Sequence, residues 1–238
     1  LVSARTSGIT SLPDQIDHTL MDTWDFDVLN MSSSEAKAHV LMMFGSLGLL
    51  RDNEDDVDEI NQTKPNSLDS ETASETGFCS VKTVCHFLER VETGYRANAY
   101  HNFQHAVDVT HTVYRYVVLT EPRTHVTQLE KFSLMIAALS HDLDHPGVNN
   151  AFLVNTRDPL ATVYNDSSVL ENAHVACLYN LINTRQVRDT TVSSNMSSNT
   201  GDAVADSSAD SSSTAHDTAN VFALLDDDLY RDVRSTII

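Results

Sequence analysis

Two histidine-rich motifs contain the residues of this chain best suited to chemistry. The first reads YHNFQHA over residues 100–106, and the second reads HDLDHPG over residues 141–147. In the second motif His141 and Asp142 are adjacent, so one short stretch of backbone brings an imidazole and a carboxylate to the same place. This ligand set suits zinc, and the carboxylate can also reach a harder cation such as magnesium. Together the motifs favour a metal-dependent hydrolase.

The first motif places two histidines four residues apart. On a helix, His101 and His105 would share a face, with about 5–6 Å between their Cβ atoms. His105 would lie deeper in the helix and could reach a metal, whereas His101, at the helix start, could face a bound substrate. A lone histidine on an apolar helix is more often a core residue with satisfied hydrogen bonds. The neighbouring Tyr100 and Asn102, together with the second motif, favour the functional interpretation.

The negative charge of the chain is concentrated in two stretches. The formal net charge is −19, and residues 51–77 hold nine acidic residues against Arg51 and Lys64. Residues 186–217 hold five acidic residues against Arg188. Acidic tracts repel phosphate backbones and anionic lipids, so we expect neither nucleic acid nor a membrane surface as a partner. The low apolar content of both stretches predicts disordered inserts.

Length and composition fit one domain with a sizeable core, or at most two small ones, and mildly favour helices. The chain has 238 residues with 41% hydrophobic content and only 7 Gly and 5 Pro. Cys79, Cys85 and Cys177 form no CxxC pattern, so we expect reduced thiols and a cytoplasmic location. No apolar run approaches the ~18–20 residues of a membrane span. Because the chain starts without methionine or a signal peptide, we expect a piece of a longer protein. Segments of that longer protein outside this sequence could still anchor it to a membrane.

The spacing of apolar residues predicts helices and no β-strand, so the expected fold class is all-α. Apolar residues recur every three or four positions over residues 14–50, with Ser32–Ser34 before Glu35 as the expected N-cap. The remaining expected helices span residues 78–94, 102–119, 128–139, 148–154, 169–182 and 221–238.

Several motifs in this chain resemble the class I 3′,5′-cyclic nucleotide phosphodiesterases of the HD metallohydrolase superfamily. The resemblance lies in YHNFQHA at 100–106, HDLDHPGVNN at 141–150 and LENAH at 170–174, and further in WDFDV at 24–28, VETGY at 91–95, YND at 164–166 and RDVR at 231–234. It covers residues 14–50, 78–185 and 219–238. It implies a compact multi-helix catalytic domain over residues 12–238, with the two acidic stretches as insertions and residues 1–11 as a linker.

The resemblance also implies an activity, namely hydrolysis of cAMP, cGMP or both to nucleoside 5′-monophosphates, which ends a cyclic nucleotide signal. It implies that His105, His141 and Asp142 hold a first cation, Zn²⁺. Asp142 would also bridge to a second cation, Mg²⁺ or Mn²⁺. A hydroxide between the cations would attack phosphorus, and His101 would act as general acid toward O3′, a poor leaving group unless protonated.

Further roles follow from the same resemblance. Tyr100 and His101 would border the substrate phosphate. Glu171 would take part in catalysis by binding metal-bound water or orienting the acid. His145 and His174 would lie just behind the metal ligands. This chain departs from the family's LENHH pattern, because Ala173 replaces the first of its two histidines.

The resemblance implies that the C-terminal part of the domain is missing. The family's fourth ligand to the first cation is an Asp of an ATD segment, and it would follow the stretch RDVRSTII at 231–238. The glutamine and the aromatic clamp that hold the base would also follow. We therefore expect a domain truncated before its C-terminal helices, inactive by itself, with its preference between cAMP and cGMP undetermined.

Two other functions stay open from the sequence. One is a non-catalytic pseudo-phosphodiesterase that binds or scaffolds, and the other is a different HD-type nucleotide phosphohydrolase. The sequence does not determine the oligomeric state, and a homodimer is compatible with it.

Overall fold

The computed structural model describes four ranges of the chain, residues 19–51, 77–120, 126–183 and 219–238. The expected linker over residues 1–11 and the expected insert over 186–217 lie outside these ranges. Of the expected insert over 51–77, only the two end residues are described. None of the helices in the described ranges combines the length and hydropathy that crossing a membrane requires.

The described residues fold almost entirely as helices, which confirms the all-α prediction. The helices are η1 (Leu20–Asp22) and η2 (Val28–Asn30), both 3₁₀, and α1 (Ser33–Ser46), α4 (Val81–Gly94), α5 (Phe103–Thr120), α6 (Gln128–Ser140), α7 (Asn150–Thr156), α8 (Pro159–Val163), α9 (Val169–Asn183) and α10 (Asp227–Ile237). Two short strands, β1 (Leu50–Arg51) and β2 (Cys79–Ser80), pair in parallel, with Leu50 opposite Cys79. The expectation of no strand is wrong there, because two residues are too short to show an alternating pattern.

Capping side chains decide where the helices begin. The hydroxyl of Ser32 accepts the N–H of Glu35, and the Glu35 carboxylate accepts the N–H of Ser32, which is a capping box at the start of α1. This confirms Ser32 as the N-cap. The helix expected from residue 14 is wrong over residues 19–32, because Thr23 and Met31 are extended and only η1 and η2 form there.

Two further boundaries differ from expectation for local reasons. The C-terminal helix begins at Asp227 rather than at Val221, because the Asp226 carboxylate accepts the N–H of Leu229 and so caps α10. Helix α8 was not predicted, although Asp158 followed by Pro159 is a helix-start signal. The five residues of α8 are too few to show a helical spacing of apolar side chains.

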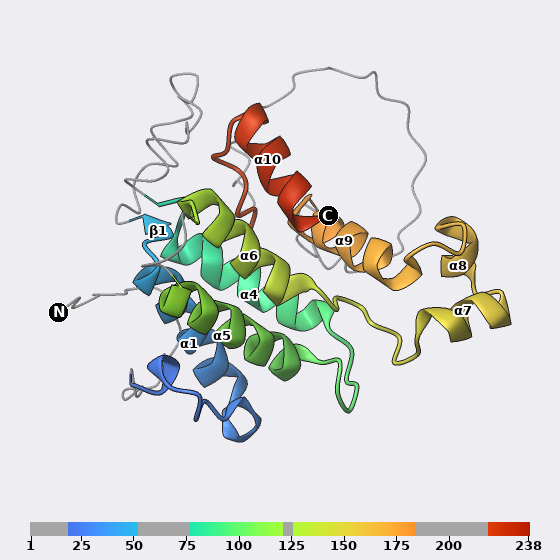
Figure 1. The fold of residues 1–238 in the computed structure, drawn as a ribbon, viewed down its shortest axis with the longest axis horizontal. Coiled ribbons are helices and arrows are strands. Elements are labelled where there is room, and N and C mark those ends of the chain that lie inside the picture. The colour runs from blue at the N-terminus through green and yellow to red at the C-terminus, as the bar shows by residue number, and fades with distance from the viewer. Residues whose placement is uncertain (1–18, 52–76, 121–125, 184–218) are drawn as a thin grey trace, which may run out of the picture.

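Helix α6 lies at the centre of the hydrophobic core. It packs against α5, α9 and α10, while α1 packs against α4 and α5 (Figure 1). The side chains of Phe132, Met135, Ile136 and Leu139 on α6 are fully buried. Because α6 is fixed on several sides, the polar residues that follow it emerge from a rigid element.

Helices α7 and α8 form an arm beside this core (Figure 1). They enclose a separate small apolar cluster that contains Leu153, Ala161, Val169 and Leu170. The last two residues belong to α9, so the arm joins the beginning of α9 to the loop that follows α6.

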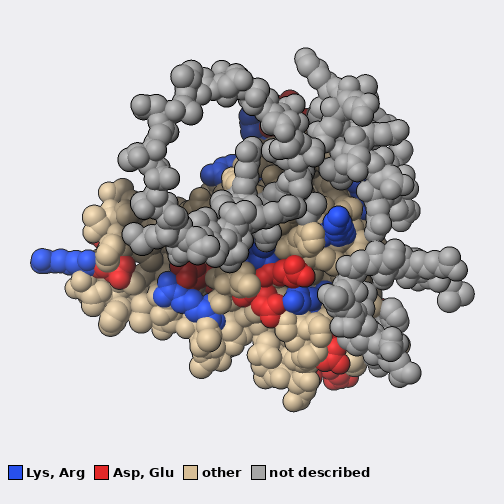
Figure 2. Space-filling view, turned by 180° about the vertical axis from the view of Figure 1, so that it is seen from behind, with Lys and Arg blue, Asp and Glu red and all other residues tan. Residues whose placement is uncertain are grey.

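Basic and acidic side chains are interspersed on the described part of the face shown in Figure 2. Some charged side chains of the described residues form ion pairs. Lys37 on α1 contacts Glu92 on α4 at 2.7 Å, and Arg96 contacts Asp144 across two loops. These pairs join segments that are far apart in the sequence, although exposed pairs contribute little to stability.

Candidate metal centre

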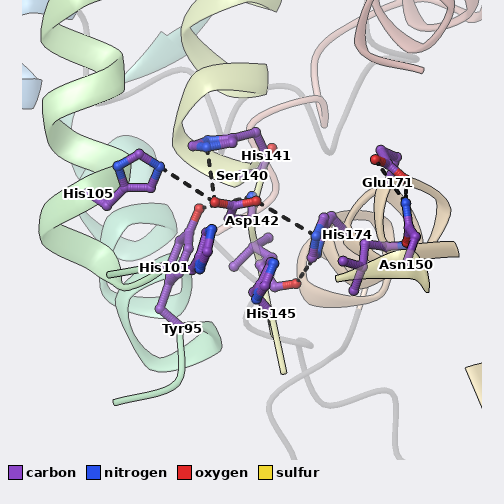
Figure 3. Close-up of polar contacts among 12 residues, drawn as sticks. Tyr95, His101, His105, Ser140, His141, Asp142, His145, Asn150, Glu171 and His174 are labelled. Carbon is purple, nitrogen blue, oxygen red and sulfur yellow. Dashed lines mark hydrogen bonds and ion pairs between the residues drawn. The ribbon is translucent and has the colours of Figure 1, made fainter. Parts of the chain in front are cut away.

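Asp142 lies at the centre of a group of histidines that come from three elements (Figure 3). His141 is the C-cap of α6, and Asp142 follows it in the next turn. His105 comes from the first turn of α5, and His174 comes from α9. The end of the buried helix α6 therefore places Asp142 where two other helices meet it.

One oxygen of Asp142 faces two histidine nitrogens. Asp142 Oδ2 lies 3.2 Å from His141 Nε2 and 3.5 Å from His105 Nε2. The three ligand atoms lie within 4.8 Å of one another and can hold a metal ion. The side chains of His105 and Asp142 are only 15% and 14% exposed, whereas that of His141 is 35% exposed, so a cation there would be open to solvent on the His141 side.

A backbone carbonyl determines which nitrogen His141 presents. His141 Nδ1 lies 2.8 Å from the carbonyl oxygen of Ala138, and a carbonyl can only accept, so Nδ1–H donates. Nε2 is then the atom available to a metal at Asp142. This is the usual arrangement of a metal-ligating histidine, whose second nitrogen is held by a hydrogen bond.

The charges of these groups suit a cation. Burial opposes ionisation of Asp142, but the hydrogen bond and charge of His141 outweigh it and lower the pKa of Asp142. Burial and the neighbouring His141 lower the pKa of His105. Burial opposes protonation of His141, but its bonds to Asp142 and Ala138 raise its pKa. A cation that binds at His141 Nε2 would therefore displace a proton.

A second group of possible ligands, consisting of Asp142, His145 and His174, fits a metal less well. The Gly147 N–H donates to His145 Nδ1 at 2.9 Å, so in the neutral ring Nε2 carries the proton and acts as a donor. Burial lowers the pKa of His145, which favours that neutral ring. The geometry thus suits His145 for donating a hydrogen bond rather than for ligating a metal.

His174 presents an acceptor to the same carboxylate. Its Nδ1–H donates to the carbonyl of Leu143 at 2.6 Å, and its Nε2 lies 3.8 Å from Asp142 Oδ1. Burial lowers the pKa of His174, so the facing Nε2 is unprotonated. His174 Nε2 and Asp142 Oδ1 are both hydrogen-bond acceptors and cannot bond to each other. A water or a cation beside them could bond to both.

His101 lies outside the helix on which we expected it. Helix α5 begins at Phe103, because the side-chain oxygen of Asn102 accepts the N–H of His105 at 3.0 Å and caps the helix. The helical placement of His101 is therefore wrong, but its proximity to His105 is correct, since their ring centroids lie 6.0 Å apart. The His101 ring stacks on His145, with centroids 3.8 Å apart.

Tyr100 and Glu171 border the group without joining either set of ligands. The Tyr100 ring lies 4.5 Å from the His105 ring, and Tyr100 is 63% exposed. The carboxylate of Glu171 accepts two contacts from Asn150 Nδ2, at 3.0 and 3.3 Å, and these bonds lower the pKa of Glu171. Figure 3 shows this pair to one side of Asp142.

Three polar residues that the sequence did not identify support the site. The Tyr95 hydroxyl donates to the carbonyl of Leu139 at 3.0 Å and accepts the N–H of Asp142 at 3.4 Å. Burial raises the pKa of Tyr95, so it stays a neutral donor. Asn150 orients Glu171, and Asn98 contacts both motif loops. Tyr95 and Asn150 stood in motifs that resembled the family, but no local spacing predicted their long-range partners.

Comparison with known proteins places these residues in a family. Residues 100–227 match the model of the 3'5'-cyclic nucleotide phosphodiesterase family. The chain is 34% identical over 184 residues to the dual specificity calcium/calmodulin-dependent 3',5'-cyclic nucleotide phosphodiesterase 1C of Mus musculus, covering 75% of this chain and 23% of that protein. It is 36% identical over 106 residues to the cGMP-specific 3',5'-cGMP phosphodiesterase 3 of Dictyostelium discoideum, covering 44% of this chain and 23% of that protein.

A solved structure agrees with this assignment. The phosphodiesterase domain of the RhoPDE fusion protein from the choanoflagellate Salpingoeca rosetta superposes with a TM-score of 0.61 at 29% identity, covering 91% of this chain and 50% of that chain. The chain thus spans about half of that domain and less than a quarter of the two curated relatives. The match of more than half of the chain to the family model shows that this chain belongs to the 3'5'-cyclic nucleotide phosphodiesterase family.

Proposed function

We propose that this protein hydrolyses 3′,5′-cyclic nucleotides to nucleoside 5′-monophosphates. The observation that carries the proposal is the convergence of His105, His141 and Asp142, with His101 beside them, in a chain of this family. The two relatives named above are called dual specificity and cGMP-specific. Because those names differ, the proposal is the substrate class, cAMP and cGMP together.

His105, His141 and Asp142 would hold the first cation, for which we propose Zn²⁺ because two imidazoles and one carboxylate form a mixed donor set. Asp142 has a second oxygen, Oδ1, for a harder second cation, Mg²⁺ or Mn²⁺. Bound cations would activate water for attack and offset negative charge on the phosphoryl oxygens.

His101 would act as the general acid. Water attack at phosphorus breaks the bond to O3′, and an alkoxide leaves poorly unless it is protonated. The His101 ring lies beside His105 without joining a ligand group, so it can hold a proton and transfer it to O3′. The exposed ring of Tyr100, tilted against the His105 ring, would border the substrate phosphate.

Three residues would support this reaction around the ligands. His145 has a ring N–H available to hydrogen-bond water. His174 would hold Asp142 or its water from the other side. Glu171, fixed by Asn150, would accept hydrogen bonds from water near the second cation. A cytoplasmic location and a homodimer remain predictions.

Removal of metal from the complete protein tests the proposal. After exhaustive chelation, cAMP and cGMP turnover should fall to background, and added Zn²⁺ with Mg²⁺ or Mn²⁺ should restore it. Each nucleotide is assayed separately, with release of the 5′-monophosphate as the readout. Full turnover in metal-free protein would contradict the metal mechanism. No turnover of either nucleotide in the metal-loaded protein would favour the non-catalytic alternative.

A further inference from the structure

One amide side chain joins the two loops that carry the motif histidines. Asn98 lies in the loop between α4 and α5, and its Nδ2 donates to the carbonyl of His101 at 3.1 Å and to the carbonyl of His145 at 2.8 Å. Both N–H groups of the amide are therefore used, one toward each loop. We propose that Asn98 is a positioning residue. It holds the His101 ring against the His145 ring, so that His101 can transfer a proton to O3′. This inference rests on the function proposed above.

The position of the His101 ring depends on its stack with the His145 ring. The His101 and His145 rings are nearly parallel, with centroids 3.8 Å apart and planes at 9°. The two histidines come from different loops, so the stack persists only if both backbones are fixed relative to each other. Asn98 donates a hydrogen bond to the carbonyl of each of these residues, and the Gly147 N–H donates to Nδ1 of the His145 ring.

The backbone of Asn98 is itself fixed. Its carbonyl accepts Asn102 Nδ2 at 3.0 Å, and the other end of the Asn102 amide caps α5. The bonds therefore form a path from the start of α5, through Asn102 and Asn98, to the loop after α6. Through this path the helix that supplies His105 also sets the position of His101.

Other contacts join the same loops without a hydrogen bond to His101 or His145. Tyr95 contacts Leu139 and Asp142, and the exposed Arg96 side chain pairs with Asp144. Arg96→Ala is therefore a matched control, because it removes a link between the same two loops two residues from Asn98. A loss that is specific to Asn98 variants then reports on His101 and not on general loosening of the loops.

The test uses two substrates that differ in their need for an acid. A cyclic nucleotide releases an alkoxide from O3′, whereas a nucleoside 5′-(p-nitrophenyl phosphate) releases a phenolate that leaves without protonation. In Asn98→Asp, which keeps the shape but removes both donors, kcat for the cyclic nucleotide should fall about 10- to 100-fold. Its KM and the kcat for the aryl ester should each change less than about threefold. Arg96→Ala should keep both rates near wild type.

Several outcomes overturn the proposal. These are equal slowing of both substrates in Asn98→Asp, an unchanged rate on the cyclic nucleotide, or the same loss in Arg96→Ala. If Asn98→Asp does not melt cooperatively, Asn98→Ala is measured in its place with the same criteria. Bound metal is quantified in every variant, because metal loss would slow both substrates together.

A spectrum of metal-free protein separates this inference from the proposed function. In ¹⁵N-histidine-labelled protein, the ring resonances of His101 and His145 should shift in the Asn98 variant. In Arg96→Ala the His101 resonances should stay unchanged, and only those of His145 should respond, because the Arg96 charge lowers the pKa of His145. Single His→Ala variants assign these resonances. Wild-type protein that turns over neither substrate would refute the proposed function, and the spectrum would then decide alone. Unchanged His101 and His145 resonances in the Asn98 variant would refute the positioning role.

Discussion

Backbone groups select the nitrogen that each histidine around Asp142 presents. Carbonyls of Ala138 and Leu143 take the Nδ1–H of His141 and His174, so both turn Nε2 toward the carboxylate. The Gly147 N–H does the reverse at His145. The local backbone thus makes His174 Nε2 an acceptor and His145 Nε2 a donor, while His141 Nε2 holds a proton against Asp142 that a cation would displace.

Replacing Asp142 and replacing His101 should give different defects. Asp142→Ala removes the carboxylate that both ligand groups share, so metal content and turnover should fall together. His101→Ala removes a group outside both sets, so metal content should stay near wild type while turnover falls about 10²-fold or more. Metal analysis of the two purified proteins beside turnover checks this. Equal metal depletion in both variants would show that His101 is not an acid independent of the metals.

The segment over residues 19–31 is an irregular element that packs onto α1 and α5. Its side chains Met21, Phe26 and Val28 are buried. The Phe26 ring stacks on His111 with centroids 4.2 Å apart and meets His39 edge-on at 5.4 Å. His111 Nε2–H donates to the carbonyl of Met21 at 3.1 Å, which ties the segment to α5 by one buried polar contact.

This contact should make the segment sensitive to acid. Burial lowers the pKa of His111, and Arg115 adds to the effect although the bond to Met21 opposes it. A histidine in the unfolded chain titrates near about 6.5, so the unfolded state binds this proton more tightly than the folded state. The contribution of His111 to stability is therefore present above that pH and is lost as the pH falls through it toward the lower folded pKa.

His111→Gln, which keeps a hydrogen-bond donor but does not titrate, isolates this effect. The free energy of unfolding should fall less in the variant than in wild type between about pH 7.5 and pH 5.5. Above about pH 7.5, where both side chains are neutral, the two proteins should show the same pH dependence. Denaturant titrations at each pH measure it. A steeper or unchanged slope in the variant would contradict the assignment.

The core connects segments that precede and follow α6 in the sequence through the side chains of α6. The ring of Phe132 stacks on Phe78, with centroids 4.6 Å apart, and meets Phe222 edge-on at 6.1 Å. Phe222 lies in the segment before α10. Arg234 of α10 lies over the ring of Tyr179 on α9. Stability of the whole domain and the position of the metal ligands after α6 therefore depend on the same packing.

Phe132→Ala should destabilise the domain by about 3–5 kcal/mol, because it leaves a cavity among well-packed aromatic rings. Phe152→Ala is the matched control, since Phe152 on α7 is 52% exposed, and it should change stability by less than about 0.5 kcal/mol. Equilibrium unfolding of both variants measures the difference. Similar losses in the two variants would show that α6 is not the centre of the core.

The sequence by itself determined the all-α class, the main helices and the metal-ligand candidates. Apolar spacing is local, and so are the capping box at Ser32 and the adjacency of His141 and Asp142. The spacing of His101 and His105 already made His105 a candidate ligand, and the resemblance to the family added His174 as a residue behind the ligands. Where periodicity and capping disagreed, as over residues 19–32, the periodic pattern was wrong, because buried side chains need not lie on a helix.

Only the tertiary structure decided how these residues act together. The ring stack of His101 on His145, the bond from Asn150 to Glu171 and the two bonds of Asn98 join residues 20 or more positions apart, with one exception, the bond from Asn98 to His101. The acceptor or donor state of each histidine likewise depends on which backbone group meets its ring. Such contacts have no spacing rule, because they arise from the packing of whole helices that brings distant loops within hydrogen-bonding distance.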